Sequence, residues 1–169
     1  MEHRRYGLGA LLCVGTVLAC SPAALADEAD ASGVCKGLKA YLAGALPGSK
    51  ITVTYTDLHG LHGGLRLTID GTGKVEQQAV RTKAGVPRRV SNAQFRALVQ
   101  LLLETAAWEQ RVPDRTPVPD ESRASLTIVA GDARSTIWEW YNDLKPNNRL
   151  IRIREKMKSI AWSPEPRGR

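Results

Sequence analysis

The chain contains few of the residues on which catalysis and metal binding usually depend. Its 169 residues include three histidines and three cysteines, and several of these lie in the first twenty positions. We find no Gly-x-Ser-x-Gly turn, His-Glu-x-x-His helix, Cys-x-x-Cys pair or phosphate-binding Gly-Lys-Ser/Thr loop. We therefore expect a protein that is not an enzyme and needs no cofactor, although catalytic groups can also meet in space without a motif.

Cysteine is too scarce for a disulfide framework. Two of the three cysteines lie in the apolar N-terminal segment, so Cys35 stands alone in the rest of the chain. Val34 and Leu38 share one helical face beside it, which predicts a short helix within residues 33–45 and a buried Cys35. A dimer bridged through Cys35 is the alternative.

No apolar run is long enough to cross a membrane. The run from Gly7 to Ala19 follows two arginines and precedes Ala24-Leu25-Ala26, the small-x-small pattern that signal peptidase cuts. The pattern predicts a signal peptide over residues 1–26, with cleavage between Ala26 and Asp27. The mature chain is then secreted or periplasmic and has no transmembrane span.

A second processing site overlaps this leader. Val17-Leu18-Ala19-Cys20 is similar to the lipobox of bacterial lipoproteins, in which the cysteine is acylated and becomes the new N-terminus. Lipidation at Cys20 would make the protein a membrane-anchored lipoprotein with a structural role in the envelope. Secretion after Ala26 and lipidation at Cys20 are therefore both open.

Positive charge is in excess and clustered. The formal net charge is +7. One basic group comprises Arg81, Lys83, Arg88 and Arg89, and the other comprises Lys145, Arg149, Arg152, Arg154, Lys156 and Lys158. Because the chain is predicted to be exported, we do not expect these groups to bind nucleic acid. They form either a solvated helix face or a surface for anionic envelope lipid or a protein partner, for which Arg88 and Arg89 are candidates.

The sequence pattern in the first half of the domain predicts three strands and a helix. Residues 50–56 alternate apolar and polar, residues 65–69 repeat the pattern, and a Gly/Asp turn leads to residues 75–80. Ser91 and Gln94 then form a capping box at the start of an amphipathic helix.

The second half repeats this order after a proline-rich connection. Residues 124–128 and 134–141 form a hairpin, and a helix runs from about Asn148 to Trp162. Trp138 and Trp140 share one face of the returning strand. We interpret them as core or helix-packing residues, and the alternative is an exposed aromatic platform for a partner.

Together these elements predict an α+β fold with an antiparallel sheet of about five strands. The order is hairpin, helix, hairpin, helix, with the helices packed on one face of the sheet. An N-terminal segment over residues 27–48 carries the short helix, the α+β domain occupies 49–162, and 163–169 form a flexible tail.

A family resemblance rests on three runs of this pattern. "GGLRLTIDGTGKV", "VSNAQFRALVQLLLETAAW" and "SLTIVAGDARSTIWEW", within about residues 50–161, resemble small exported bacterial domains of unknown function and emfourin, a protein inhibitor of thermolysin-type metalloproteases. The resemblance implies a non-enzymatic binding domain with an exported protease as partner. It assigns no inhibitory residue to this chain.

The stretch "YTDLHGLHGG" contains the two histidines outside the leader. Asp57, His59 and His62 could bind a metal only if a tight turn brought them together, and a structural zinc site would need a fourth ligand. We predict instead a loop that connects two strands and presents both histidines to a partner. Asp120 and Glu121 are adjacent carboxylates in the proline-rich connection, and we predict that both are solvated turn residues.

Overall fold

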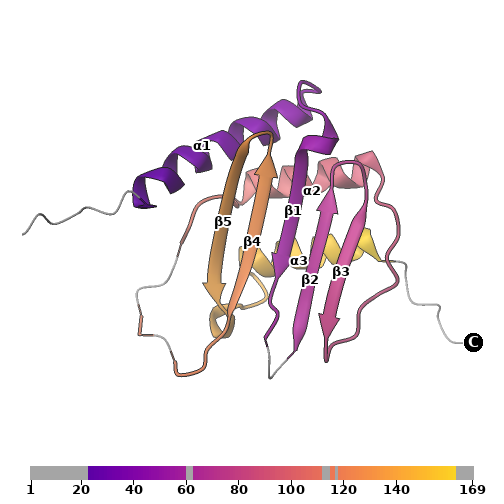
Figure 1. Cartoon of the computed structure of the whole chain (residues 1–169). Coiled ribbons are helices and arrows are strands. Elements are labelled where there is room, and N and C mark those ends of the chain that lie inside the picture. The colour runs from indigo at the N-terminus through magenta and orange to yellow at the C-terminus, as the bar shows by residue number, and fades with distance from the viewer. Residues whose placement is uncertain (1–22, 60–62, 112–114, 117, 163–169) are drawn as a thin grey trace, which may run out of the picture.

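The computed structural model describes residues 23–59, 63–111, 115–116 and 118–162. These residues form a single sheet with helices on one face (Figure 1). The described elements are α1 (Ala23–Leu42), η1 (Gly48–Lys50), β1 (Ile51–Thr56), β2 (Gly64–Asp70), β3 (Val75–Val80), α2 (Asn92–Glu104), β4 (Arg123–Ala130), β5 (Ala133–Trp140), η2 (Tyr141–Asp143) and α3 (Arg149–Ala161). The predicted α+β class and order of elements are confirmed.

The five strands are antiparallel in the order β3-β2-β1-β4-β5, so the first strand of the domain lies at the centre. Ile51, Val53 and Tyr55 of β1 are fully buried, whereas the threonines between them are only half-buried. This alternation follows from the pleat, which directs successive side chains to opposite faces. The buried set faces the helices, and the polar set forms the other face of the sheet.

Helix α2 begins as predicted. The Ser91 side chain accepts a hydrogen bond from the Gln94 backbone, and the Gln94 side chain accepts one from the Ser91 backbone. This capping box satisfies two amides that have no partner within the helix, and it is worth about 1 kcal/mol. Val90 and Phe95, on either side of the cap, are both buried.

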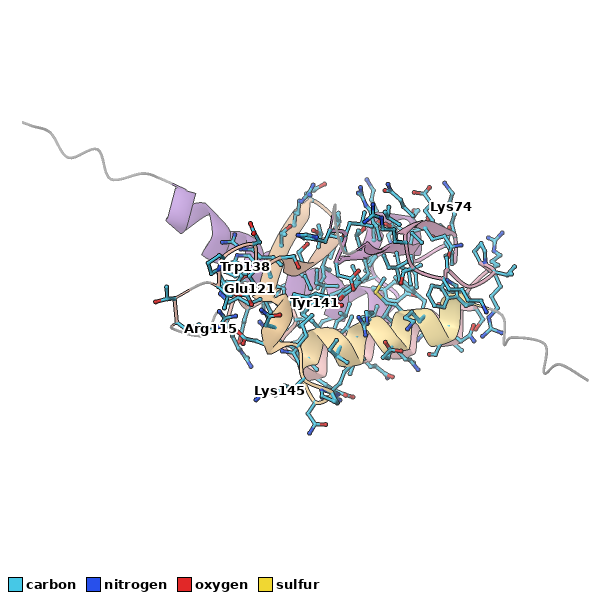
Figure 2. All side chains as sticks on the ribbon, turned by 90° about the horizontal axis from the view of Figure 1, so that it is seen from below. Lys74, Arg115, Glu121, Trp138, Tyr141 and Lys145 are labelled. Atoms are coloured by element: carbon cyan, nitrogen blue, oxygen red, sulfur yellow. The ribbon has the colours of Figure 1, made fainter. Side chains whose placement is uncertain are left out.

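Helix α3 lies beside α2 on the same side of the sheet (Figures 1 and 2). Asn148 caps its N-terminus by accepting a hydrogen bond from the Leu150 backbone, and Trp162 follows its last turn. Leu150, Ile153 and Met157 are fully buried against the sheet. The predicted helix from about Asn148 to Trp162 therefore matches the structure closely.

Helix α1 completes the layer by packing across β5 and β4, but it is longer than predicted. The helix approaches the strands so closely that a side chain has no room at Gly37, because an added Cβ there would lie 2.7 Å from the Ala130 Cβ. Cys35 is half-buried rather than fully buried. The predicted cleavage after Ala26 falls in the first turn of this helix and stays a prediction. None of the described helices has the length and apolarity that a membrane crossing requires.

Candidate functional site

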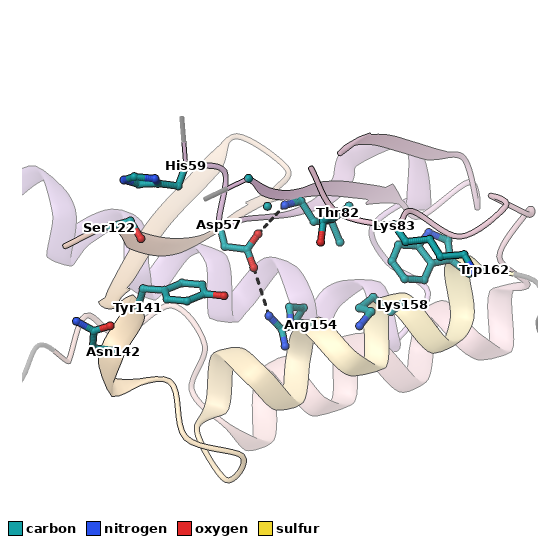
Figure 3. Close-up of a pocket in the computed structure, with 13 residues that line it drawn as sticks. Asp57, His59, Thr82, Lys83, Ser122, Tyr141, Asn142, Arg154, Lys158 and Trp162 are labelled. Carbon is teal, nitrogen blue, oxygen red and sulfur yellow. Dashed lines mark hydrogen bonds and ion pairs between the residues drawn. The ribbon is translucent and has the colours of Figure 1, made fainter. Parts of the chain in front are cut away.

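A polar cleft opens at the end of the sheet where β1 passes into the loop leading to β2 (Figure 3). Its volume is about 440 Å³. The β1–β2 loop, the segment after β3, η2 and the outer side of α3 form its walls. The side chains that determine its chemistry are Asp57, His59, Lys83, Tyr141, Arg154 and Lys158.

A buried carboxylate stands at the inner wall of the cleft. Asp57 is 6% exposed, and its Oδ1 accepts a hydrogen bond of 2.6 Å from the Leu65 backbone. Its Oδ2 accepts bonds from the Tyr55 hydroxyl at 3.0 Å and from Arg154 Nη1 at 3.3 Å (Figure 3 shows the arginine contact). Because three donors share this charge, Asp57 fastens the β1–β2 loop to both β2 and α3.

Glycine is required where the loop returns to the sheet. Gly64 has φ +137°, and an added Cβ there would lie 2.4 Å from the Asp57 carbonyl oxygen. Just before it, His59 and Gly63 form an antiparallel bridge with backbone hydrogen bonds of 2.8 and 2.9 Å. The described ends of this stretch therefore connect β1 and β2, and Gly64 allows the backbone to approach Asp57.

The Tyr55 hydroxyl beneath Asp57 is a donor and not a base. Burial raises the pKa of this phenol far above its ordinary value of 10.0, and the neighbouring Asp57 charge raises it further. Tyr55 therefore keeps its proton and holds the carboxylate in place.

Positive charge dominates the outer wall. Arg154 donates from Nε to Glu155 at 3.0 Å, and Lys158 contacts both Glu155 oxygens at 3.2 Å. Lys158 Nζ also lies 5.5 Å from the centre of the Trp162 ring. Lys83 adds a third cation to the lining, against the one carboxylate of Asp57. The cleft therefore attracts negatively charged groups.

The sequence candidates for a metal site are only partly brought together. Asp57 and His59 both line the cleft, whereas His62 lies outside the described residues. Within the described part of the chain, no group of three His, Cys, Asp or Glu side chains is placed to hold a metal ion. A metal bound to Asp57 would also have to displace the arginine that already neutralises it.

Arg88 and Arg89 lie outside the cleft and hold the chain to its neighbours. Arg88 donates from its backbone and its guanidinium to the last carbonyls of α3, at Ala161, Ile160 and Ser159. This is the favourable position for a cation at a helix C-terminus. Arg89 donates to the Thr72 carbonyl at 3.1 Å. Both arginines thus have a structural use that the sequence did not indicate.

Trp138 and Trp140 lie on the face of the sheet opposite the helices, so the interpretation that they pack on a helix is wrong, whereas burial holds for Trp140, which is 7% exposed. Trp140 pairs with Arg123 across the strands, whereas the neighbouring Ile137 pairs with Leu126 of the helix-facing core. The two indole rings meet edge to face at 5.0 Å, and the Arg123 guanidinium lies 3.8 Å from the Trp138 ring. Trp140 is buried, and the Arg115 guanidinium lies 5.5 Å from the centre of its ring.

Glu121 corrects another expectation. Its side chain is 1% exposed and forms two hydrogen bonds of 2.6 and 2.8 Å with Arg115. Hydrogen bonding by Arg115 lowers the pKa of Glu121 to about 2. Only Asp120 is the exposed turn residue that the sequence predicts, with φ 61°.

Comparisons with family models, curated proteins and solved structures give no match for this chain. The emfourin resemblance accordingly stays a prediction.

Proposed function

We propose that the chain is an exported, non-enzymatic binding domain that holds a protein partner at the cleft and the adjoining β1–β2 loop. The observation that carries this proposal is the cleft itself, whose one lining carboxylate, Asp57, is already satisfied by three donors. A preformed concavity with a few convergent polar groups is the usual form of a binding site. Its loop is supported by the central strand of the sheet, as recognition loops commonly are.

The nature of the partner is suggested by the sequence. The predicted signal peptide places the mature chain outside the cytoplasm, where exported proteins are the available partners. The resemblance to emfourin makes a thermolysin-type metalloprotease the first partner class to test. Inhibition would require the domain to bind at or near the protease active site.

Site-directed photo-crosslinking tests the location of partner binding. A photoreactive amino acid in place of His59 lies on the cleft rim, and one in place of Thr72 lies in the exposed turn at the opposite end of the sheet. We expect exported proteins of the source culture to crosslink at position 59 and not at position 72. Equal crosslinking at both positions would place partner binding elsewhere.

Protease assays test the inhibitory form of the proposal separately. The mature chain beginning at Asp27 is added to a panel of metallo-, serine and cysteine proteases, and residual activity is measured. Loss of activity confined to the thermolysin type supports the inhibitor, while full activity throughout removes inhibition from the proposal. Mass spectrometry of the exported protein gives its N-terminus: unmodified Asp27 supports secretion, and an acylated Cys20 makes it an envelope lipoprotein.

A further inference from the structure

We infer that the cleft recognises an oxyanion, namely the carboxylate of an acidic residue on the bound partner. The inference rests on the proposed function and names the chemical group that the cleft selects. Lys83, Arg154 and Lys158 give the lining three positive charges against the one negative charge of Asp57, and Glu155, outside the lining, pairs with two of these three cations. Because Asp57 is saturated by internal donors, the cations are the charged groups that the lining offers to a ligand.

The Arg154 guanidinium has remaining capacity for a carboxylate. Nη1 contacts Asp57, Nε contacts Glu155 and the guanidinium also interacts with the Tyr55 hydroxyl, so its five N–H donors outnumber these three partners. The side chain is 24% exposed, so a ligand can reach it from the cleft. Arginine is the side chain best suited to binding a planar carboxylate through two parallel hydrogen bonds.

An internal carboxylate already shows what these cations bind. Glu155 contacts both Arg154 and Lys158, at 3.0 and 3.2 Å, although it is 50% exposed on the outer side of α3. A half-exposed ion pair of this kind is weak, so its carboxylate can turn into solvent at little cost. A partner carboxylate can then take its place, and Glu155 acts as an internal competitor for the site.

Neutral groups complete the site. Figure 3 shows Tyr141, from η2, with its hydroxyl directed toward Arg154 across the cleft. Trp162, beyond Lys158, provides an apolar wall. A cavity of about 440 Å³ with these features accepts an acidic side chain and part of its peptide. The same donors would accept phosphate, so the test must separate the two oxyanions.

The test is a chemical-shift titration of the isotope-labelled mature chain at constant ionic strength. The probes are N-acetyl-glutamate amide, its glutamine counterpart and inorganic phosphate. We expect saturable shifts around Asp57, Tyr141 and Lys158 with the glutamate compound and none with the glutamine compound. Saturation by phosphate alone would overturn the carboxylate assignment.

Three charge variants give the expected pattern of affinities. Lys158→Gln should weaken glutamate binding about tenfold, the value of one charge-assisted hydrogen bond. Glu155→Gln should tighten it severalfold because the internal competitor is removed. Lys145→Gln, an exposed cation outside the cleft, should leave the affinity unchanged. Equal weakening by Lys145→Gln, or no tightening by Glu155→Gln, would overturn the inference.

The two proposals fail in different ways. If position 59 crosslinks a partner but no probe binds the cleft, partner binding stands and the oxyanion assignment is wrong. If the glutamate compound binds with the expected variant pattern but nothing crosslinks at position 59, the cleft selects carboxylates and the protein partner is wrong.

Discussion

Two carboxylate–arginine pairs connect α3 to the sheet, and they differ in their access to water. Arg149, the first residue of α3, pairs with Glu139 of β5 at 3.0 Å, and the two side chains are 10% and 8% exposed. Arg154, further along the helix, pairs with Asp57 at 3.3 Å and is 24% exposed. The first pair is enclosed by protein, whereas the second borders the cleft.

The surroundings of each pair explain what it can do. Arg149 also donates to the Ala106 carbonyl, and Asn148 donates to Glu139, so protein groups occupy the first site. Arg149 Nη2 is buried without a hydrogen-bond partner among the described residues, and no ligand can reach it from the cleft. The ion pair of Arg149 therefore only holds α3 to the sheet. The ion pair of Arg154 holds the helix too, and its arginine is also available for recognition.

Breaking the enclosed pair should have the largest effect. Glu139→Gln keeps the shape of the side chain but leaves the Arg149 charge uncompensated and nine-tenths shielded from water. We expect the free energy of unfolding to fall by about 3–5 kcal/mol. Urea unfolding followed by tryptophan fluorescence measures this loss.

The double variant Glu139→Gln, Arg149→Met is the matched control. It removes the stranded charge, so it should recover a large part of the stability lost in the single variant. A loss below 1 kcal/mol in Glu139→Gln would show that water reaches this pair as well, and the contrast with Arg154 would disappear.

The pair at the cleft should be less costly to break. Asp57→Asn keeps an acceptor for the Leu65 backbone but no longer neutralises Arg154, which can be hydrated from the cleft. We expect a loss of about 1–3 kcal/mol in the same urea experiment. A loss as large as that of Glu139→Gln would contradict the difference in water access.

A third arginine pair, Arg115–Glu121, should make the free energy of unfolding depend on pH. The folded pKa of Glu121 is about 2, below the ordinary value of 4.5, so the unfolded chain binds this proton first as the pH falls. The stability that the pair contributes is complete above pH 4.5 and is lost between pH 4.5 and 2. The difference in stability between the native chain and Glu121→Gln should therefore shrink over this range. Urea unfolding at stepwise pH values checks it, and a constant difference would exclude the depressed pKa.

Local sequence signals predicted the elements because they act over a few residues. The apolar alternation in β1, the Ser91 capping box and the apolar stripe of α3 depend on neighbours within one turn or one strand. The extension of α1 to Ala23 was missed, although the alanine-rich stretch before residue 33 has high helix propensity. The site was missed for another reason: Asp57 and Arg154 are 97 residues apart, and no periodic pattern links them.

Strand β5 shows why the tryptophans were placed on the wrong face. The alternation indicates that Trp138 and Trp140 share a face, but it does not say which face meets the helices. The helix-facing positions include Ser135 and Glu139, both 6% exposed, and the outer positions include Arg134 and Thr136, so both faces of β5 mix apolar and polar residues. Glu139 is tolerated inside because Arg149 neutralises it, and that partner cannot be identified from the local pattern.

Removing the Glu155 carboxylate, the exposed partner of Arg154 and Lys158, should lower the free energy of unfolding least. Glu155→Gln removes two ion pairs on the outer side of α3, where water and salt screen the charges. The i,i+3 pair of Glu155 with Lys158 contributes about 0.3 kcal/mol and an exposed ion pair rarely more than about 1 kcal/mol, so we expect a loss below about 1 kcal/mol. Urea unfolding at low and high salt measures it, and the loss should vanish in 1 M salt, whereas the loss in Glu139→Gln should persist. A large, salt-independent loss in Glu155→Gln would mean that Glu155 fixes Arg154 and Lys158 in place and does not compete with a ligand for them.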